Sequence, residues 1–125
     1  MVTEDYVSFE TAKLLKEKRF DEKCRAFYVL WFDEEVEGPK EDEAENWNIE
    51  PKYFSAPTLQ MVMKWLREKH IVIVPEVETF HADGSVSSWE YHIWCDDNYE
   101  EGQNSFSSYE EACEAAIKYC LENLI

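Results

Sequence analysis

The sequence predicts an α+β domain in which three helices alternate with two antiparallel hairpins, in the order α-ββ-α-ββ-α. The prediction depends on helix-period apolar stripes in three segments, on aromatic and β-branched runs bounded by turn residues, and on their order along the chain. Two such hairpins indicate one antiparallel sheet of about four strands with the helices mainly on one face. The length fits a single domain, residues 1–125.

The first helix is expected over residues 9–18, because Ser8 is a good N-cap and Phe9, Ala12 and Leu15 share one side. The aromatic and β-branched residues 25–32 then indicate a strand. Apolar side chains alternate onto both faces of this strand, so we expect both faces to be covered.

Residues 33–50 are strongly acidic and contribute half of the formal net charge of −16. Gly38-Pro39 marks a turn within them. We interpret the segment as an acidic hairpin tip or loop whose return strand is short, residues 51–54. The nine acidic side chains, set against Lys40 alone, are Asp33, Glu34, Glu35, Glu37, Glu41, Asp42, Glu43, Glu45 and Glu50.

The second helix is expected to start at residues 55–57, with Pro57 tolerated in its first turn, and to run to about residue 69. Its apolar side chains span an arc of roughly 200°, whereas a helix with one buried face needs an arc nearer 100°. We therefore expect the helix either to be deeply buried or to contact a second body. The apolar positions are Leu59, Met61, Val62, Met63, Trp65 and Leu66.

Residues 71–80 and 85–95 are expected to form a second hairpin around Ala82-Asp83-Gly84. A three-residue loop with Gly84 in the left-handed conformation gives this hairpin one coherent apolar face. Pro75 removes a backbone donor, which places its strand at a sheet edge or at a bulge. The expected pairs are Val77 with Trp89, Ile73 with Ile93 and Ile71 with Cys95.

The C-terminal part is predicted to consist of a polar loop, residues 96–104, and a third helix. Ser108 and Glu111 have the spacing of a capping box that opens this helix. One stripe of small and apolar side chains should face the sheet. It comprises Cys113, Ala116, Ile117, Cys120, Leu121 and Leu124.

No motif of the sequence specifies catalysis, so we expect a protein that is not an enzyme. Cys113 and Cys120 fall in the apolar stripe, and no close Cys or His pair has zinc-ligand spacing, so no metal and no cofactor is expected. His92 and Cys95 lie on opposite sides of a strand, which argues against a nucleophile–base pair. A small enzyme or metal protein that uses His81, His92, Cys95 or nearby carboxylates stays open as a second alternative.

The charge of the chain restricts its partners. A net charge of −16 repels nucleic acid backbones and anionic membranes and attracts basic proteins, so no direct nucleic-acid or membrane binding is expected. The N-terminus lacks the features of a secretory signal, and the longest apolar run, residues 26–32, is too short to span a bilayer. We expect a cytoplasmic protein with reduced cysteines.

The wide apolar arc of the second helix, the two-faced first strand and the lack of catalytic motifs predict a non-enzymatic protein-interaction module. The alternative is an acidic nucleic-acid mimic that inhibits a host DNA-binding or defence protein, with Trp47 as an interface anchor. A solvated acidic segment that aids solubility, with Trp47 packed on the sheet, is the other interpretation of these residues. Trp31 and Trp94 on the face away from the helices would form an apolar patch, through which a homodimer is conceivable. The candidate interaction residues are Asp33, Glu34, Glu35, Glu37, Glu41, Asp42, Glu43, Glu45, Trp47, Met61, Trp65 and Trp94.

Three blocks of the sequence, residues 7–18, 55–70 and 108–125, coincide with the three predicted helices. They resemble a family of small uncharacterised proteins carried by prophages, phages and other mobile elements of Bacteroides-group gut bacteria. The resemblance implies an accessory role in a mobile element inside a bacterial cell, and it supplies no activity or ligand. Similar sequences have Gly where Arg19 stands here, and a shorter, less acidic stretch in place of residues 33–50.

Overall fold

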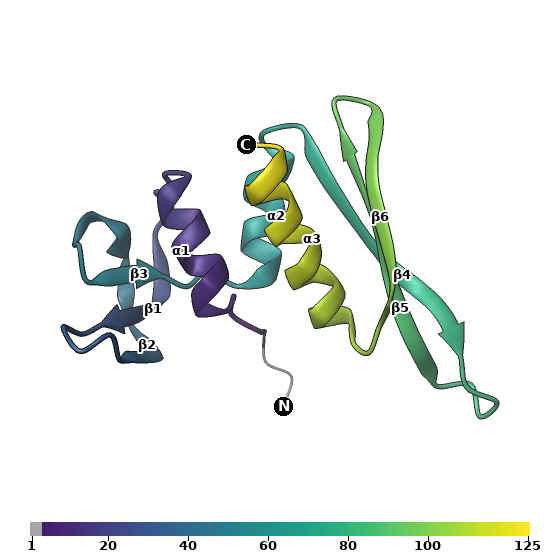
Figure 1. Cartoon of the computed structure of the whole chain (residues 1–125), viewed down its shortest axis with the longest axis horizontal. Coiled ribbons are helices and arrows are strands. Elements are labelled where there is room, and N and C mark those ends of the chain that lie inside the picture. Colours follow the sequence, from purple (N-terminus) through teal and green to yellow (C-terminus); the bar gives the residue numbers. More distant parts are fainter. Residues whose placement is uncertain (1–3) are drawn as a thin grey trace. The chain divides into compact units, whose positions relative to one another are not determined.

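The computed structural model describes residues 4–125 of the chain (Figure 1). The described residues form three α-helices, one short 3-10 helix and two three-stranded antiparallel sheets, which confirms the predicted α+β class. The prediction of one sheet of four strands is wrong. The chain divides into a first compact unit, Met1–Leu59 with Ile125, and a second unit, Gln60–Leu124, and each unit contains one sheet. The expectation of a single domain stays a prediction.

The first unit begins with helix α1 (Phe9–Glu17), close to the predicted range. Ser8 caps the helix, because its side-chain oxygen accepts a hydrogen bond from the backbone N–H of Thr11 at 3.3 Å. Arg19 follows with a φ of 62°, the left-handed conformation in which helices commonly end. The chain then forms β1 (Cys24–Leu30), β2 (Val36–Glu45), the 3-10 helix η1 (Trp47–Ile49) and β3 (Tyr53–Ser55), with the sheet order β2-β1-β3.

Strand β1 is covered on both faces, as its apolar pattern predicts. On one face the Tyr28 hydroxyl donates to the backbone oxygen of Val7 at 2.6 Å, and the Tyr28 ring packs edge-on against Phe9. On the other face Phe27 stacks on Trp47 with ring centroids 4.1 Å apart. The central strand therefore carries the core of the first unit.

The acidic segment, residues 33–50, differs from its predicted form. Residues 31–35 make the tight turn of the hairpin, and the ten residues of β2 then pair antiparallel with β1, with Leu30 opposite Val36. The expected return strand, residues 51–54, corresponds to β3, which pairs with the other edge of β1. Every residue of β2 is exposed. Its charges are compatible with a strand because it lies at the sheet edge, where its side chains remain in water.

The second unit contains most of helix α2 (Leu59–Arg67), three long strands and helix α3 (Tyr109–Asn123). The strands are β4 (Ile71–Phe80), β5 (Val86–Cys95) and β6 (Asn98–Phe106), in the order β4-β5-β6. The predicted β4–β5 register is confirmed, and Gly84 has the expected positive φ of 89°. Strand β4 lies at the edge, as Pro75 indicates.

The polar loop expected over residues 96–104 is wrong, because most of it forms strand β6. Cys95 pairs with Asn98, so only Asp96 and Asp97 remain to connect the strands. Both have positive φ, 48° and 72°, as a two-residue type I′ turn requires. Asp-Asp is a weaker signal for this turn than Asn-Gly, so the turn was not predicted. Strand β6 was not predicted either, because the polar residues that suit an edge strand also suit a loop.

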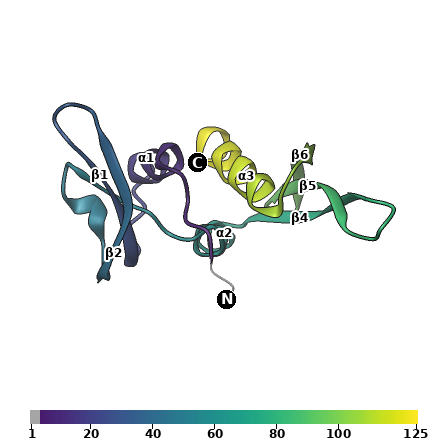
Figure 2. The ribbon, with the colours of Figure 1, turned by 90° about the horizontal axis from the view of Figure 1, so that it is seen from below.

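Helix α3 covers one face of the β4-β5-β6 sheet, as Figure 2 shows. The predicted cap is present: the Ser108 side chain accepts the backbone N–H of Glu111 at 3.1 Å. The apolar stripe of the helix is buried from Ala112 to Leu121, while Leu124 is half-buried. Opposite it, Tyr91 is buried and stacks on Phe106.

Helix α2 is shorter than predicted but has the expected wide buried surface. Val62, Met63, Trp65 and Leu66 are buried and Met61 is half-buried, so the deeply buried form of the prediction holds. No helix within residues 4–125 combines the length and the apolar character needed to cross a bilayer.

Candidate functional site

The predicted interaction residues belong to both units of the chain. The acidic side chains follow the β1–β2 turn and strand β2 and are exposed. Asp33 and Asp42 accept the backbone N–H groups of Glu35 and Glu43. Lys40 lies 2.8 Å from Glu37 and holds the pKa of that carboxyl below its ordinary value. The Tyr6 hydroxyl donates to Glu41, which raises the pKa of the Tyr6 phenol. The acidic side chains of β2 form an exposed row.

The predicted tryptophans and Met61 belong to both units: Trp47 lies in the first, and Met61, Trp65 and Trp94 lie in the second. Trp47 packs on the first sheet, and its ring N–H donates to the backbone oxygen of Cys24 at 2.8 Å, as the packing interpretation requires. Trp65 is only 7% exposed and lies within helix α2, beside the half-buried Met61. Trp94, in contrast, is 42% exposed on β5.

Trp94 belongs to an apolar patch on the second sheet. Strand alternation directs Tyr91 and Ile93 toward α3 and places Trp94 on the opposite face. The Tyr99 ring packs edge-on against Trp94 with centroids 5.2 Å apart. We call this face, away from α3, the open face. Its large apolar side chains are exposed by 37–51%: Val72, Val74, Trp94 and Tyr99.

A hollow of about 660 Å³ lies at one end of this patch. Val72 and Trp94 form its apolar part, and Arg67, Asp96 and Asp97 are among the charged residues that line it. His70 also lines the hollow, with its Nδ1 3.6 Å from a carboxylate oxygen of Asp96. The hollow therefore offers an apolar wall beside carboxylates.

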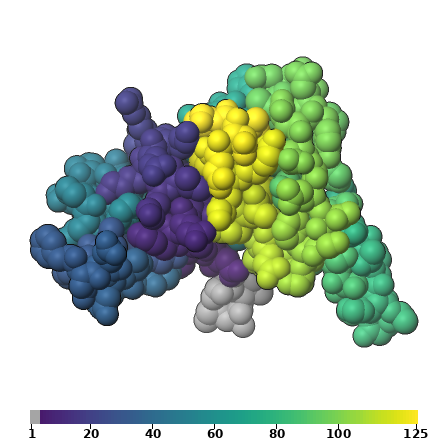
Figure 3. Space-filling model, in the orientation of Figure 1, coloured from purple at the N-terminus to yellow at the C-terminus, as the bar shows by residue number. Residues whose placement is uncertain are grey.

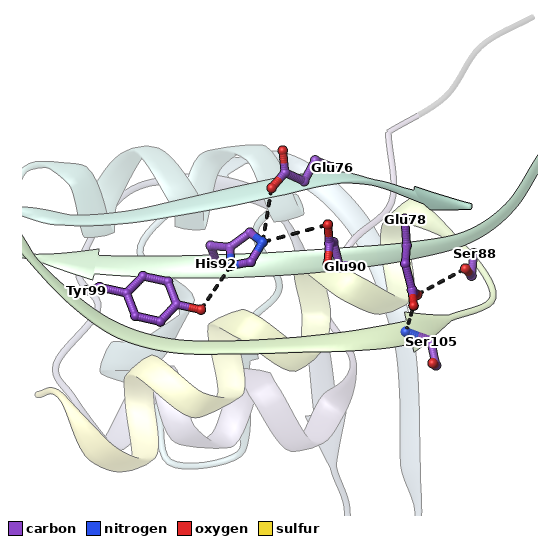
Figure 4. Close-up of polar contacts among 7 residues, drawn as sticks. All are labelled: Glu76, Glu78, Ser88, Glu90, His92, Tyr99 and Ser105. Atoms are coloured by element: carbon purple, nitrogen blue, oxygen red, sulfur yellow. Dashed lines mark hydrogen bonds and ion pairs between the residues drawn. The ribbon is translucent and has the colours of Figure 1, made fainter. Parts of the chain in front are cut away.

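The polar part of the open face centres on His92, as Figure 4 shows. One ring nitrogen, Nε2, lies 3.0 Å from a carboxylate oxygen of Glu76 and 3.8 Å from one of Glu90. The other, Nδ1, lies 3.0 Å from the Tyr99 hydroxyl. Three neighbouring strands thus contribute to one cluster.

Glu78 extends the row of carboxylates toward the hairpin tip (Figure 4). Its Oε2 accepts hydrogen bonds from the Ser88 hydroxyl at 3.0 Å and from the backbone N–H of Ser105 at 2.7 Å. Ser105 has a φ of 69°, so the carboxylate holds an unusual backbone conformation in β6. Figure 3 shows the β4–β5 tip projecting beyond α3, and Phe80 near this tip is 65% exposed.

The cysteine thiols of the second unit lie away from the open face. Burial raises the pKa of Cys113 to about 11 and that of Cys120 to about 12, so both are protonated at neutral pH and pack in the α3 stripe. Cys95 pairs with the buried Ile71 and by alternation lies on the face opposite His92. His81 lies at the start of the β4–β5 loop. These groups are not brought together with His92.

Sequence reasoning missed Glu76, Glu90 and Tyr99. The predicted pairing of Val77 with Trp89 already places Glu76 opposite Glu90 and brings His92 onto the same face two residues along. That signal was present in the sequence, whereas Tyr99 could not be placed without strand β6.

No protein-family model matches the chain, and no curated protein and no solved structure matches it significantly.

Proposed function

We propose that the protein is a non-enzymatic interaction module that uses the open face to bind a partner protein segment carrying both apolar and Lys or Arg side chains. The observation behind this proposal is the exposed patch of Val72, Val74, Trp94 and Tyr99 beside a row of carboxylates. Large aromatic side chains are typical anchors of protein interfaces, and contiguous exposed apolar surface commonly marks a binding site.

Charge complementarity supports a basic partner. Glu76, Glu78 and Glu90 border the patch on one side, and Asp96 and Asp97 follow Trp94 at the other end. Together with the net charge of −16, they attract a cationic segment and accelerate its association. The same charges oppose a symmetric homodimer through this face, because a two-fold contact brings each acidic patch near its own copy.

The cellular setting is part of the proposal. The resemblance of residues 7–18, 55–70 and 108–125 to mobile-element proteins of Bacteroides-group bacteria favours an accessory role in a bacterial cytoplasm. A basic, partly apolar segment of a host or phage protein would be the partner there. Direct binding to nucleic acid or to a membrane stays disfavoured by the negative charge.

A random peptide library tests the proposal. Peptides selected on the purified protein should combine aromatic or aliphatic residues with Lys or Arg. Trp94→Ala should weaken their binding by about 30-fold, because removing a buried aromatic anchor costs about 2 kcal/mol. Trp31→Ala is the matched control, since Trp31 is 39% exposed in the first unit and should leave the affinity unchanged.

Three results would contradict the proposal. Selected peptides that lack basic residues would contradict the charge argument. Equal binding of the peptides to Trp94→Ala and to the unsubstituted protein would show that the open face is not the binding site. A concentration-dependent dimer that Trp94→Ala dissociates, measured by sedimentation, would assign this face to a second copy of the chain instead.

The acidic nucleic-acid mimic is the second candidate, and the exposure of all ten residues of β2 favours it. Glu41, Asp42, Glu43 and Glu45 lie close together in the part of β2 where its register against β1 shifts, between Ala26–Glu41 and Cys24–Glu45. A basic protein that binds this row should lose affinity steeply with salt. Amide substitutions at Glu41, Asp42, Glu43 and Glu45 should abolish its binding, whereas neutralising four acids of α3 to the same net charge should not.

A further inference from the structure

We propose that Glu76, Glu90 and His92 form a binding site for one divalent transition-metal ion of the zinc type. One ligand atom from each residue lies within 4.8 Å of the others. The three side chains come from the adjacent strands β4 and β5, so the sheet holds their backbones in fixed register. The three ligands are separate from Val72, Val74 and Trp94 of the apolar patch, but Glu76 and Glu90 also belong to the carboxylate row of the interaction proposal.

The distances fit the size of such an ion. Zinc binds imidazole nitrogen and carboxylate oxygen at about 2.0–2.2 Å, so two ligands of a tetrahedral ion lie about 3.3 Å apart. The His92 Nε2 distances of 3.0 Å to Glu76 and 3.8 Å to Glu90 fall on either side of that value. Small rotations of the two partly exposed carboxylates bring all three atoms to one ion. Water or a partner's side chain can supply the fourth ligand.

Tyr99 provides the second contact that a metal-binding histidine usually has. With Nε2 on the metal, the remaining proton of His92 is on Nδ1, and the Tyr99 hydroxyl lies 3.0 Å away to accept it. This hydrogen bond fixes the ring with Nε2 directed at the carboxylates (Figure 4). Gly102 permits the arrangement, because a Cβ there would lie 2.1 Å from the Tyr99 hydroxyl oxygen.

The pairing of the strands gives an independent reason for a cation. Glu76 and Glu90 lie directly opposite each other on β4 and β5. Like charges at directly opposed positions destabilise a sheet. A divalent ion between the carboxylates converts that repulsion into two favourable contacts, and His92 adds the third.

The ligand set also indicates which ion binds. Imidazole favours zinc and its transition-metal neighbours, whereas Mg²⁺ and Ca²⁺ prefer oxygen ligands only. Glu76 is about half exposed, so water competes and the affinity should be moderate. We therefore expect binding of one Zn²⁺ in the micromolar range and little response to Mg²⁺ or Ca²⁺.

Calorimetric titration of the tag-free chain with ZnCl₂ tests the site. His92→Ala, Glu76→Gln and Glu90→Gln should each weaken binding at least about tenfold, and Tyr99→Phe about tenfold through loss of the orienting hydrogen bond. His70→Ala is the matched control, because His70 also lies beside a carboxylate, that of Asp96 at 3.6 Å, but within residues 4–125 it belongs to no group of three ligand atoms. It should leave zinc binding unchanged.

Two further measurements establish whether the ion occupies this cluster. Long-range ¹H–¹⁵N NMR spectra should show His92 metal-bound at Nε2, and circular dichroism should show that each variant is folded. Zinc binding that survives His92→Ala, or that disappears in Cys95→Ser, would overturn the proposal, as would a Kd above about 1 mM. Trp94→Ala should keep its zinc, so failure of the interaction proposal and failure of the metal site are distinguishable.

Discussion

A single glycine determines how the polar part of the open face is built. At Gly102 the Tyr99 hydroxyl passes so close to the backbone that any side chain would collide with it, and a Cβ would also lie 3.0 Å from His92 Nδ1. Gly102 pairs with His92 across the strands. The absence of a side chain on β6 thus lets a tyrosine three residues away reach the histidine of the neighbouring strand.

The buried thiols are the other residues whose environment has a measurable consequence. Burial raises the pKa of Cys113 to about 11 and that of Cys120 to about 12, above the ordinary value of 9.0. The folded state therefore keeps protons that the unfolded state releases. The stabilisation that results is complete below about pH 9 and is lost as the pH rises toward 11–12.

We expect the free energy of unfolding to fall between pH 9 and pH 11, by about 1.4 kcal/mol per pH unit for each such thiol. Urea unfolding at pH 8, 9.5 and 10.5 measures this slope. Cys120→Ala lowers stability at every pH by removing packed volume. Its unfolding free energy should nevertheless fall less steeply with pH, because the variant has one titrating thiol fewer. Cys95→Ser serves as a control on a less buried cysteine, and equal slopes in Cys120→Ala and the unsubstituted chain would refute the assignment.

Among the elements, helices α1 and α3 were the most predictable. Each begins at a cap that the sequence displays: Ser8 for α1 and Ser108 for α3 both accept the expected backbone N–H. The β4–β5 hairpin was predictable in register because only one register collects its apolar side chains on one face. Local chemistry was sufficient for these elements.

The edge strands were not predictable, for a physical reason. Strands β2 and β6 consist mainly of polar residues, since an edge strand needs few apolar contacts once a central strand has formed. Periodicity therefore carries little information about them. Because β6 was not predicted, Tyr99 could not be included in the predicted site. Its ring partner Trp94 was correctly predicted to lie on the sheet face away from the helix.

The cap of α3 gives a test at this scale. Ser108→Ala removes the acceptor for the Glu111 backbone N–H, and we expect a loss of about 1 kcal/mol in unfolding free energy. Urea denaturation with an unchanged m-value would measure it. Ser108→Asp, which preserves an acceptor near the helix N-terminus, should retain most of the stability. A Ser108→Ala variant as stable as the original chain would show that the cap is replaced by another contact.

For the molecule as a whole, two three-stranded sheets replace the single sheet expected from element order. Each expected hairpin has a third strand from its own part of the chain: β2 pairs with β1 in the first unit, and β6 pairs with β5 in the second. Each sheet is therefore completed by local pairing. Element order alone could not show this, because the polar sequences of β2 and β6 predict loops.

The net charge of −16 leads to a prediction for the complete chain. Repulsion among like charges destabilises the compact state, and salt screens it, with a Debye length of about 10 Å at 0.1 M. Raising NaCl from about 0.02 M to 0.5 M should raise the urea midpoint. The variant with amides at Glu41, Asp42, Glu43 and Glu45 should gain less, because less repulsion remains. A midpoint that falls with NaCl would mean that attractive ion pairs dominate.

Strand β2 has a consequence for how copies of the protein coexist. One side of its backbone has no neighbouring strand in the first sheet, so over ten residues it is a template onto which another extended chain could pair. If the β2 strands of two copies approached each other, their carboxylates would come close together. The electrostatic repulsion between them opposes edge-to-edge aggregation. Removing these charges, as in the variant with amides at Glu41, Asp42, Glu43 and Glu45, removes this barrier and should leave the strand edge open to pairing between copies.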